Sequence, residues 1–394
     1  MRILHVTYIF PPKPNVADGI THVVYHLTKT LAKNGHDVTV YASNAMDLHG
    51  KERIEINSSP ACVDGVKVRY FPYLLRYGTV FFTPSMFRLI RDEIKKFDVI
   101  HIHDARCLQS AITMHYAELF NIPIIFQPHG SFKSPLPYGK LRKISRLFID
   151  KLYAEKILQK CSKMVALSWV EAEQYKRMGV PEEKIATIPN GIDLSEYANL
   201  PPRGCFKKKF GIKEEEKIVL YLGRIHRIKG IDILVKAFAS VVKELDNVKL
   251  AIVGPDDGYL NELRILIKAL KMENNVLITG PLYGKDKLEA YVDAEVYVLP
   301  SRYETFPMSI LEAVACGTPI ILTENCAINE YFRSKVGLAV KPDPSALSGA
   351  LLEMLLNKQQ MSTFRQNCRT IVEAFSISRT VSKLERAYED AAHD

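Results

Sequence analysis

The chain has 394 residues, 47% of them apolar and 25% charged, which is the composition of a soluble globular protein with room for two domains. No apolar run approaches the roughly 20 residues of a membrane span, and the opening MRILHVTYIF is too short and too weakly charged for a signal peptide. The net charge of +9 raises nucleic acid as a partner, but no helix-turn-helix, RRM or zinc-finger pattern accompanies it, so no nucleic-acid partner is predicted.

The first half of the chain alternates apolar segments of strand length with helical patterns, as α/β proteins with parallel sheets do. A helix is predicted over 21–33, where Val23, Val24, Leu27 and Leu31 share one face and Asn34–Gly35 forms a stop signal. Strands are predicted at 2–7, 37–42, 66–71, 98–103, 122–127, 163–167 and 185–188.

The loops after three of these strands carry candidate site residues. Gly19, in the loop after the first strand, allows close approach of backbone to a ligand. His101 and His103 share one face of their strand, with His103 nearer its carboxyl end, and His129 precedes Gly130 at the end of the next strand. A lone histidine is more often structural than catalytic, but this placement favours a role for His129 in positioning a sugar or an acceptor. A His-x-His metal site is the competing interpretation, and further ligands at recognisable spacing are missing.

Residues 131–161 are strongly basic, with eight Lys and Arg against two acids and with apolar residues interleaved. This pattern is typical of an amphipathic helix. Such a helix either rests on an anionic membrane or lipid-linked acceptor or packs its apolar side on its own domain, and the sequence leaves both open.

The second half repeats the alternation, with strands predicted at 217–223, 248–254, 276–279, 296–300, 319–322 and 336–340. A helix after Lys229 carries apolar residues from Ile231 to Leu245 at helical spacing. Pro189, Pro201, Pro202 and a lysine run suit a boundary, so we predict domains at 1–200 and 201–375, followed by a terminal helix at 376–394.

A basic loop follows the strand predicted at 217–223. Its Arg224 and Lys229 are fixed cations of the kind that stabilise negative charge on a bound anion. The alternative is that Arg224 and Lys229 belong to a solvated basic loop with no binding role. Asp256 and Asp257 are adjacent, which suits a Mg²⁺–diphosphate bridge poorly, so no metal and no cofactor are predicted. The seven scattered cysteines form no Cys-x-x-Cys pair, which indicates a reducing, cytoplasmic location.

The most informative stretch is 300–319, PSRYETFPMSILEAVACGTP, at a strand-to-helix junction. Pro307 is predicted as the first helical residue, and the free N–H groups of Met308 and Ser309 would then form a phosphate site. Glu304 would lie before the helix and Glu312 about two turns into it, where carboxylates can accept hydrogen bonds from vicinal sugar hydroxyls. Phosphate and hydroxyl recognition together indicate a nucleotide-sugar.

These motifs resemble glycosyltransferase family 4. Residues 304–319 are similar to its donor signature E-G-F-G-L-x-x-L-E-A-M-A-x-G-x-P, with Thr305 and Pro307 in place of two glycines and both acids kept. Residues 223–230 resemble its G-R-x4-K-G element, 98–103 its D-V-V-H-x-H strand, and 129–130 its His-Gly pair. The resemblance extends over essentially the whole chain.

The resemblance implies a GT-B fold, in which two Rossmann-like doubly wound α/β domains face each other across a cleft and a terminal helix crosses back to the first. It also implies a retaining, metal-independent hexosyltransferase that moves a sugar from a nucleotide-diphosphate donor to a glycan, lipid-linked or small-molecule acceptor in cell-surface polysaccharide or glycoconjugate synthesis. The resemblance also implies roles for individual residues. The implied catalytic residues are Glu304, His129, Arg224 and Lys229. The implied donor-binding residues are Arg224, Lys229 and Glu304 with Gly19, Phe306, Met308, Ser309 and Glu312, and the implied acceptor-side residues are His103 and His129.

Two rival functions remain at this point. A sugar-nucleotide epimerase or hydrolase would use a similar fold and turn over the donor without an acceptor. A non-catalytic protein bound to anionic membrane through 131–161 would show steep salt dependence and no response to nucleotides.

Overall fold

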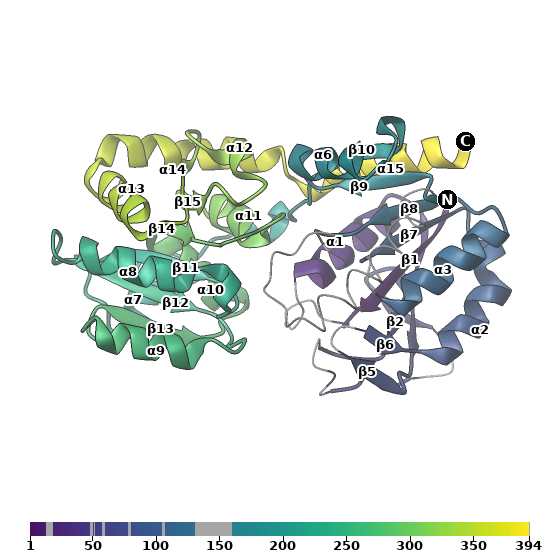
Figure 1. Ribbon diagram of the computed structural model, residues 1–394, viewed down its shortest axis with the longest axis horizontal. Coiled ribbons are helices and arrows are strands. Elements are labelled where there is room, and N and C mark those ends of the chain that lie inside the picture. The colour runs from purple at the N-terminus through teal and green to yellow at the C-terminus, as the bar shows by residue number, and fades with distance from the viewer. Residues whose placement is uncertain are drawn as a thin grey trace. The chain divides into compact units, whose positions relative to one another are not determined.

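The computed structural model describes residues 1–12, 19–47, 50, 52–56, 60–77, 80–104, 107–130 and 160–393. The chain divides into two compact units, the first formed by Met1–Gly191 with Ile377–Asp394 and the second by Ile192–Ser376 (Figure 1). This division lies earlier than the predicted boundary near residue 200. The reason is that the N–H of Ile192 bonds the carbonyl of Phe375 at 2.8 Å, so the chain enters and leaves the second unit side by side.

The first unit is built on an eight-stranded sheet in the order β10-β9-β8-β7-β1-β2-β4-β3, parallel except for the β3–β4 pair. Its central strands are buried along almost their whole length, as the continuous apolar runs predict. The strands are β1 (Arg2–Ile9), β2 (Asp37–Ser43), β3 (Ala61–Val63), β4 (Val66–Phe71), β7 (Val99–His103), β8 (Ile124–Gln127), β9 (Lys163–Ala166) and β10 (Ile185–Thr187).

Helices cover both faces of this sheet (Figure 1). They are α1 (Gly19–Lys33), α2 (Pro84–Glu93), α3 (Leu108–Leu119), α6 (Trp169–Arg177) and α15 (Ile377–His393). Helix α15 packs against α1 and buries Val381, Leu384 and Tyr388, so the end of the chain belongs to the first unit's core.

A short hairpin, β5 (Leu75–Tyr77) with β6 (Val80–Phe82), precedes α2. Neither this hairpin nor β3 is predicted from the sequence. The hairpin is nonetheless anchored: the side chain of buried Gln109 donates to the carbonyl of Phe81 at 2.7 Å.

The second unit has a six-stranded parallel sheet in the order β13-β12-β11-β14-β15-β16. The chain order reverses between β11 and β14, which is where ligands bind in open α/β sheets. Its strands are β11 (Lys217–Leu222), β12 (Val248–Val253), β13 (Val276–Gly280), β14 (Ala294–Leu299), β15 (Ile320–Thr323) and β16 (Gly337–Val340).

The helices of this unit include two that depart from prediction. Helix α8 ends at Val241, short of the predicted Leu245, and α11 begins at Met308 because Pro307 has extended backbone (ψ 116°) and is the N-cap. The helices are α7 (Cys205–Phe210), α8 (Ile231–Val241), α9 (Leu260–Ala269), α10 (Gly284–Asp293), α11 (Met308–Ala315), α12 (Asn329–Phe332), α13 (Pro344–Leu356) and α14 (Lys358–Glu373).

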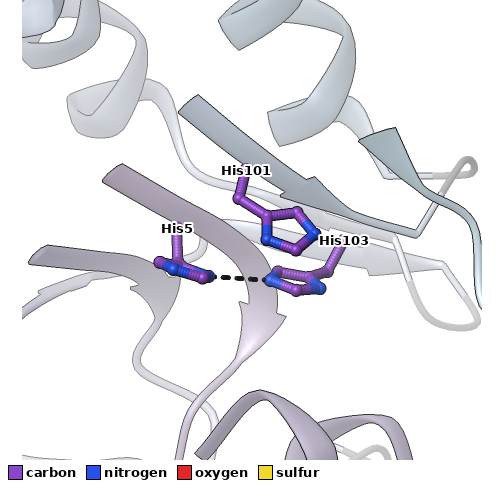
Figure 2. Close-up of side chains that lie close together, drawn as sticks. All are labelled: His5, His101 and His103. Atoms are coloured by element: carbon purple, nitrogen blue, oxygen red, sulfur yellow. Dashed lines mark hydrogen bonds between the residues drawn. The ribbon is translucent and has the colours of Figure 1, made fainter. Parts of the chain in front are cut away.

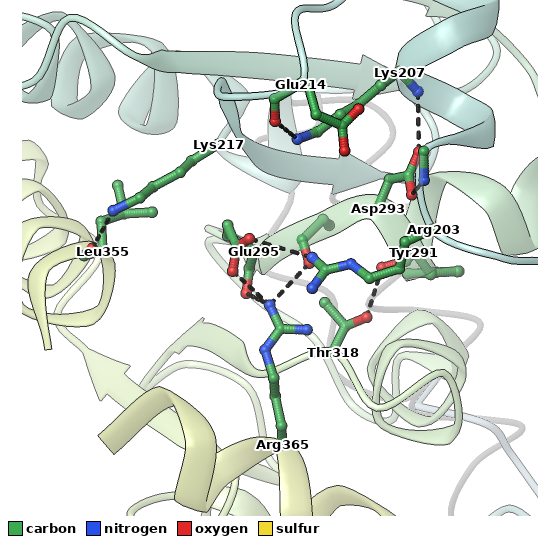
Figure 3. A network of polar contacts seen from close by, with 12 residues as sticks. Arg203, Lys207, Glu214, Lys217, Tyr291, Asp293, Glu295, Thr318, Leu355 and Arg365 are labelled. Atoms are coloured by element: carbon green, nitrogen blue, oxygen red, sulfur yellow. Dashed lines mark hydrogen bonds and ion pairs between the residues drawn. The ribbon is translucent and has the colours of Figure 1, made fainter. Parts of the chain in front are cut away.

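Polar contacts join the outer layers of the second unit to its central strand (Figure 3). Asp293 accepts from the N–H groups of Gly204 and Lys207 at the start of α7. Glu295, on β14, accepts from Arg365 at 2.6 Å and Arg203 at 3.2 Å. These contacts fix α7, α10 and α14 around β14, whose carboxyl end leads into the candidate site.

Candidate functional site

Glu304 lies in the loop that follows β14, and Lys229 lies in the loop that follows the neighbouring strand β11. The ammonium of Lys229 is hydrogen-bonded to Oε1 of Glu304, which also accepts from the hydroxyl of Ser301 at 3.0 Å. Both ionic side chains are mostly buried, 16% and 14% exposed. The structure therefore brings together the two residues that the sequence placed in separate motifs, as a shielded ion pair at the switch point of the sheet.

The loop that carries Lys229 is held by its own residues and by the β14 loop. In this loop the 3₁₀ turn η6 (Arg227–Lys229) is capped by His226, whose Nδ1 accepts from the N–H of Ile228 at 3.1 Å. Gly230 then turns the chain with φ +66°, and a Cβ there would lie 2.0 Å from the carbonyl oxygen of Pro300. Only glycine allows this approach of the two loops.

Arg302 adds a second connection between these loops. Its N–H donates to the carbonyl of Ile228 at 2.8 Å, and its guanidinium forms two bonds to Asp232, at 2.8 and 2.7 Å. A paired planar contact of this kind fixes orientation as well as distance. Arg302 is thus a positioning residue for the Lys229 loop, and the sequence motifs do not reveal it.

Glu312 is buried within α11, so it does not lie on the solvated face of that helix. Its two oxygens have separate partners: Lys287 donates to Oε1 at 2.9 Å and Tyr291 donates to Oε2 at 2.9 Å. Burial alone would lower the pKa of Lys287, but Glu312 raises it above its ordinary value. The carbonyl of Tyr291 accepts in turn from Thr318 at 2.7 Å (Figure 3).

The other donor residues predicted from 300–319 have different surroundings. Met308 and Ser309 start α11, so their N–H groups have no partner within the helix. The hydroxyl of Ser309 accepts from Tyr297 at 2.8 Å. Phe306 is buried, with its ring centroid 6.3 Å from that of Phe375, and its contacts are those of a core residue.

Arg224 is 53% exposed and pairs with Asp257 at 2.6 Å. The neighbouring Asp256 caps a helix instead, because its Oδ1 accepts from three N–H groups at the start of α9. The two adjacent aspartates are therefore engaged in an ion pair and in a helix cap. The structure gives Arg224 and Lys229 different acidic partners rather than a shared one.

In the first unit, the predicted His101 and His103 lie together with His5, which the sequence did not single out (Figure 2). The ring of the predicted His129 stacks on that of His103, with centroids 5.3 Å apart. Nδ1 of His5 lies 2.9 Å from Nε2 of His103, and Nδ1 of His103 lies 3.0 Å from Nε2 of His129. The only sequence signal for His5 is a polar residue inside the apolar run of β1. The four rings form a cluster that extends from the core of the sheet to the loop after β8.

The histidine cluster is buried, and burial lowers the pKa of each ring, to about 3 for His5 and His129. The rings are accordingly neutral at pH 7. His5, His101 and His103 offer three nitrogens within 4.8 Å of one another, so His5 supplies a third potential metal ligand that the spacing did not reveal. Nδ1 of His5 bonds His103, and Nδ1 of His101 lies 2.7 Å from the hydroxyl of Tyr388. Nε2 of His5 and Nε2 of His101 are buried and have no hydrogen-bond partner among the described residues.

His129 itself has φ +51°, a left-handed conformation that is unusual for a residue other than glycine. The loop is held by Glu171, a buried carboxylate that accepts from the N–H of Gly130 at 3.1 Å and of Leu167 at 2.7 Å. Burial raises the pKa of Glu171. Glu171 is a positioning residue that the sequence did not reveal.

Of the remaining predicted positions, Gly19 is exposed at the first residue of α1. The basic stretch 131–161 lies outside the described residues except for Lys160 and Cys161. None of the helices in the described part of the chain is both long and apolar enough to cross a bilayer.

Two family models match the chain in succession. The Glycosyltransferase Family 4 model matches residues 17–196, and the Glycosyl transferases group 1 model matches residues 203–371. Together they leave only short segments unmatched, at the two ends and at 197–202.

Relatives that match most of the chain, and solved structures, are also glycosyltransferases or sugar-linked synthases by name. The chain is 27% identical to an alpha-monoglucosyldiacylglycerol synthase of Streptococcus pneumoniae, over 92% of this chain and 80% of the relative. It is also 27% identical to an N-acetyl-alpha-D-glucosaminyl L-malate synthase of Bacillus anthracis, over 93% of each. The crystal structure of Anabaena HepE in complex with UDP and glucose matches with a TM-score of 0.78, 19% identity and 98% coverage of both chains, which shows a shared GT-B fold. The chain belongs to the family 4 glycosyltransferases and is a transferase enzyme with the GT-B fold.

Proposed function

We propose that this enzyme transfers a sugar from a nucleoside-diphosphate sugar to an acceptor hydroxyl, with retention of anomeric configuration and without a metal ion. The observation that supports this most strongly is the shielded Lys229–Glu304 pair between β11 and β14. A cation next to a carboxylate at this position can stabilise the departing diphosphate while the carboxylate bonds the transferred sugar. The Anabaena HepE structures are complexes with UDP and glucose or with UDP-glucose, which supports a nucleotide-sugar donor.

The proposed roles follow the chemistry of each group. Lys229 and Arg224 neutralise the diphosphate, aided by the N–H groups of Met308 and Ser309 at the start of α11. Glu304 contacts the transferred sugar and Glu312 the ribose, whereas Phe306 supports the loop between them from the core.

In the first unit, we assign Gly19 to the donor side, because it allows backbone to approach a ligand. We assign His129 to the acceptor side and His103 to a positioning role behind it, because both ring nitrogens of buried His103 are engaged by His5 and His129. A neutral imidazole donates a hydrogen bond at one nitrogen and accepts one at the other, which suits contact between His129 and a hydroxyl group.

The acceptor we propose is lipid-linked, with a role in cell-surface glycoconjugate or polysaccharide synthesis at the cytoplasmic face of a membrane. The name of the Streptococcus pneumoniae relative contains a diacylglycerol, which supports a lipid acceptor. The name of the Bacillus anthracis relative contains L-malate, so a small hydroxyl compound is the second candidate.

The test is transfer from a panel of nucleotide-sugars by the wild type, Lys229→Ala and Glu304→Gln. Lys243, exposed beyond the end of α8, provides a control for loss of a lysine charge as Lys243→Ala. We expect both site variants to lose at least about a hundredfold in kcat/KM, the scale at which removal of a charge-stabilising group acts. Near-normal transfer by both variants would reject the assigned roles, and rapid donor turnover without any acceptor would favour an epimerase or hydrolase.

A further inference from the structure

The β5–β6 hairpin of the first unit has two unlike faces. Its strands pair antiparallel with Leu75 opposite Phe82 and Arg76 opposite Phe81, so Leu75 and Phe82 share one face. Phe81 is fully buried, with its ring centroid 5.1 Å from that of Tyr73, whereas Leu75 is 71% and Phe82 36% exposed. Leu74, beside them, is 64% exposed.

The exposed apolar patch, formed by Leu75 and Phe82 with Leu74 beside them, is held in place by the core. Gln109 donates to the carbonyl of Phe81 at 2.7 Å, and the N–H of Leu74 donates to the carbonyl of Phe82 at 2.9 Å. Two adjacent leucines on an anchored hairpin differ from the single exposed apolar residues that most surfaces carry. Their exposure is therefore a built feature of the fold.

The hairpin and the adjoining α2 carry exposed positive charge, while Arg69 and Arg91 are paired with Glu93 and Asp92. Between Arg69 and Arg91 the sequence has four arginines and no acidic residue. Arg76 and Arg88 are exposed, one within the hairpin and one on the adjoining α2, and the guanidinium of Arg53 lies 4.1 Å from the centre of the Tyr73 ring. Apolar side chains ringed by arginine and aromatic residues match the boundary between acyl chains and anionic headgroups.

A cavity of about 430 Å³ is lined by residues that flank the hairpin in the sequence. Pro72, just before the hairpin, and Ser85, just after it, line this cavity together with Ile54, Ile56 and Tyr70. A protein that inserted the hairpin into a bilayer would therefore bring this cavity, which Glu55 and Arg69 also line, close to the membrane surface.

We infer that the β5–β6 hairpin docks this enzyme on anionic membrane through Leu74, Leu75 and Phe82, with Arg76 and Arg88 on the lipid headgroups. This inference rests on the proposed function in one respect: docking presents the enzyme to a lipid-linked acceptor. It gives the membrane contact a site separate from the basic stretch 131–161.

The test is flotation of the full-length protein with vesicles of phosphatidylcholine alone or mixed with phosphatidylglycerol. Wild type is expected to float with the mixed vesicles. Leu74→Ser with Leu75→Ser should weaken partitioning at least about tenfold, because two apolar side chains lose their burial. Arg76→Gln with Arg88→Gln should reduce binding to mixed vesicles and lower its salt dependence.

The matched control is Ile265→Ser, which removes an equally exposed apolar side chain (70%) from α9 of the second unit and should leave vesicle binding unchanged. Insertion has an independent reporter. Trp169 is the only tryptophan, so in a Trp169→Phe background the variant Phe82→Trp should shift its emission to the blue on mixed vesicles.

The inference would be overturned if the wild type floated with neither vesicle type. It would also be overturned if the double leucine variant bound the mixed vesicles as strongly as the wild type does. A leucine variant that changes only from dimer to monomer in sedimentation would assign the hairpin to a protein contact instead, and would also overturn it. Stabilisation by nucleotide-sugars is measured in parallel on every variant. Intact stabilisation without vesicle binding rejects only the docking site, whereas vesicle binding without stabilisation rejects the proposed function.

Discussion

Nζ of Lys287 lies 2.9 Å from Oε1 of Glu312, and this ion pair joins α10 to α11 in the second unit. Together with the hydroxyl of Tyr291, Lys287 fixes the carboxylate that we assign to the ribose of the donor. A ribose hydroxyl must therefore bond a carboxylate whose orientation is set in advance, which reduces the entropy lost on binding. Lys287 is a positioning residue for the donor site.

Replacing Lys287 should affect both stability and donor affinity. Lys287→Met leaves the buried Glu312 carboxylate without its cation, at an expected cost of about 1–3 kcal/mol in unfolding free energy. The donor Kd should rise about tenfold, equal to about 1.4 kcal/mol, because the carboxylate is no longer held in place. Thermal unfolding and calorimetric titration measure the two effects.

Lys285→Met is the control for this prediction. Lys285 lies on the same helix, and its side chain is 76% exposed. Its loss should change neither quantity by more than about 0.5 kcal/mol. Equal effects of the two substitutions would show that the Lys287–Glu312 pair has no special role.

Gly230→Ala should disable the Lys229 loop. The added Cβ would lie 2.0 Å from the carbonyl oxygen of Pro300, so the loops after β11 and β14 must separate. Gly211→Ala is a matched control, since Gly211 has a similar φ of +65° with open space around its Cβ position. The control should cost about 1–2 kcal/mol of backbone strain, whereas Gly230→Ala should cost clearly more and should also weaken donor binding. Equal losses in the two variants would contradict a steric requirement at Gly230.

The histidine cluster predicts a loss of stability in acid. His5, His101, His103 and His129 have pKa values below the ordinary 6.5, so the unfolded chain binds more protons than the folded one at pH between about 6.5 and the folded values. Stability is then complete above pH 6.5 and falls as the pH is lowered. Each ring contributes up to about 1.4 kcal/mol per pH unit. Glu171, with its raised pKa, changes stability in the opposite direction but is one group against four.

The midpoint of thermal unfolding measured from pH 7.5 to pH 5 checks this dependence. His103→Gln should reduce the slope, and His115→Gln should not, because His115 is exposed on α3. A midpoint that stays constant across this range in the wild type would show that the buried rings do not resist protonation.

Chelation should leave donor binding unchanged. In the proposed site Lys229 and Arg224 supply the positive charge that a divalent cation provides in other phosphate sites. Titration of a nucleotide-sugar in the presence and absence of EDTA should give the same Kd within about twofold, a difference of only about 0.4 kcal/mol. A large loss of affinity with EDTA would mean that a metal ion belongs to the site.

Most of the two sheets could be predicted, because buried parallel strands are continuous apolar runs between turn residues. The strands predicted at 2–7, 37–42 and 217–223 match β1, β2 and β11 within a few residues. The three-residue strands of the hairpin could not be predicted, because their pairing depends on anchoring contacts such as that from Gln109 to Phe81.

The candidate site was partly predictable for a related reason. Glu304 and Lys229 lie in motifs that follow strands, so their loops could be placed at one edge of a sheet. Their direct pairing, and the roles of Lys287 and Arg302, depend on which helices and loops pack together, and no local pattern records that. His5 and Glu171 could not be predicted for the same reason, because the hydrophobic pattern of the strand and of the helix that contain them does not mark either residue.

We propose that the Lys229–Glu304 pair belongs to a nucleotide-sugar site. Calorimetric titration of UDP-glucose and other nucleotide-sugars into the wild type and into Lys229→Ala, with Lys243→Ala as the control, tests this assignment. We predict saturable binding of at least one nucleotide-sugar by the wild type and the control, and a loss of at least about tenfold in affinity, about 1.4 kcal/mol, in Lys229→Ala. Equal affinity in Lys229→Ala, or no binding of any nucleotide-sugar by the wild type, would contradict this assignment.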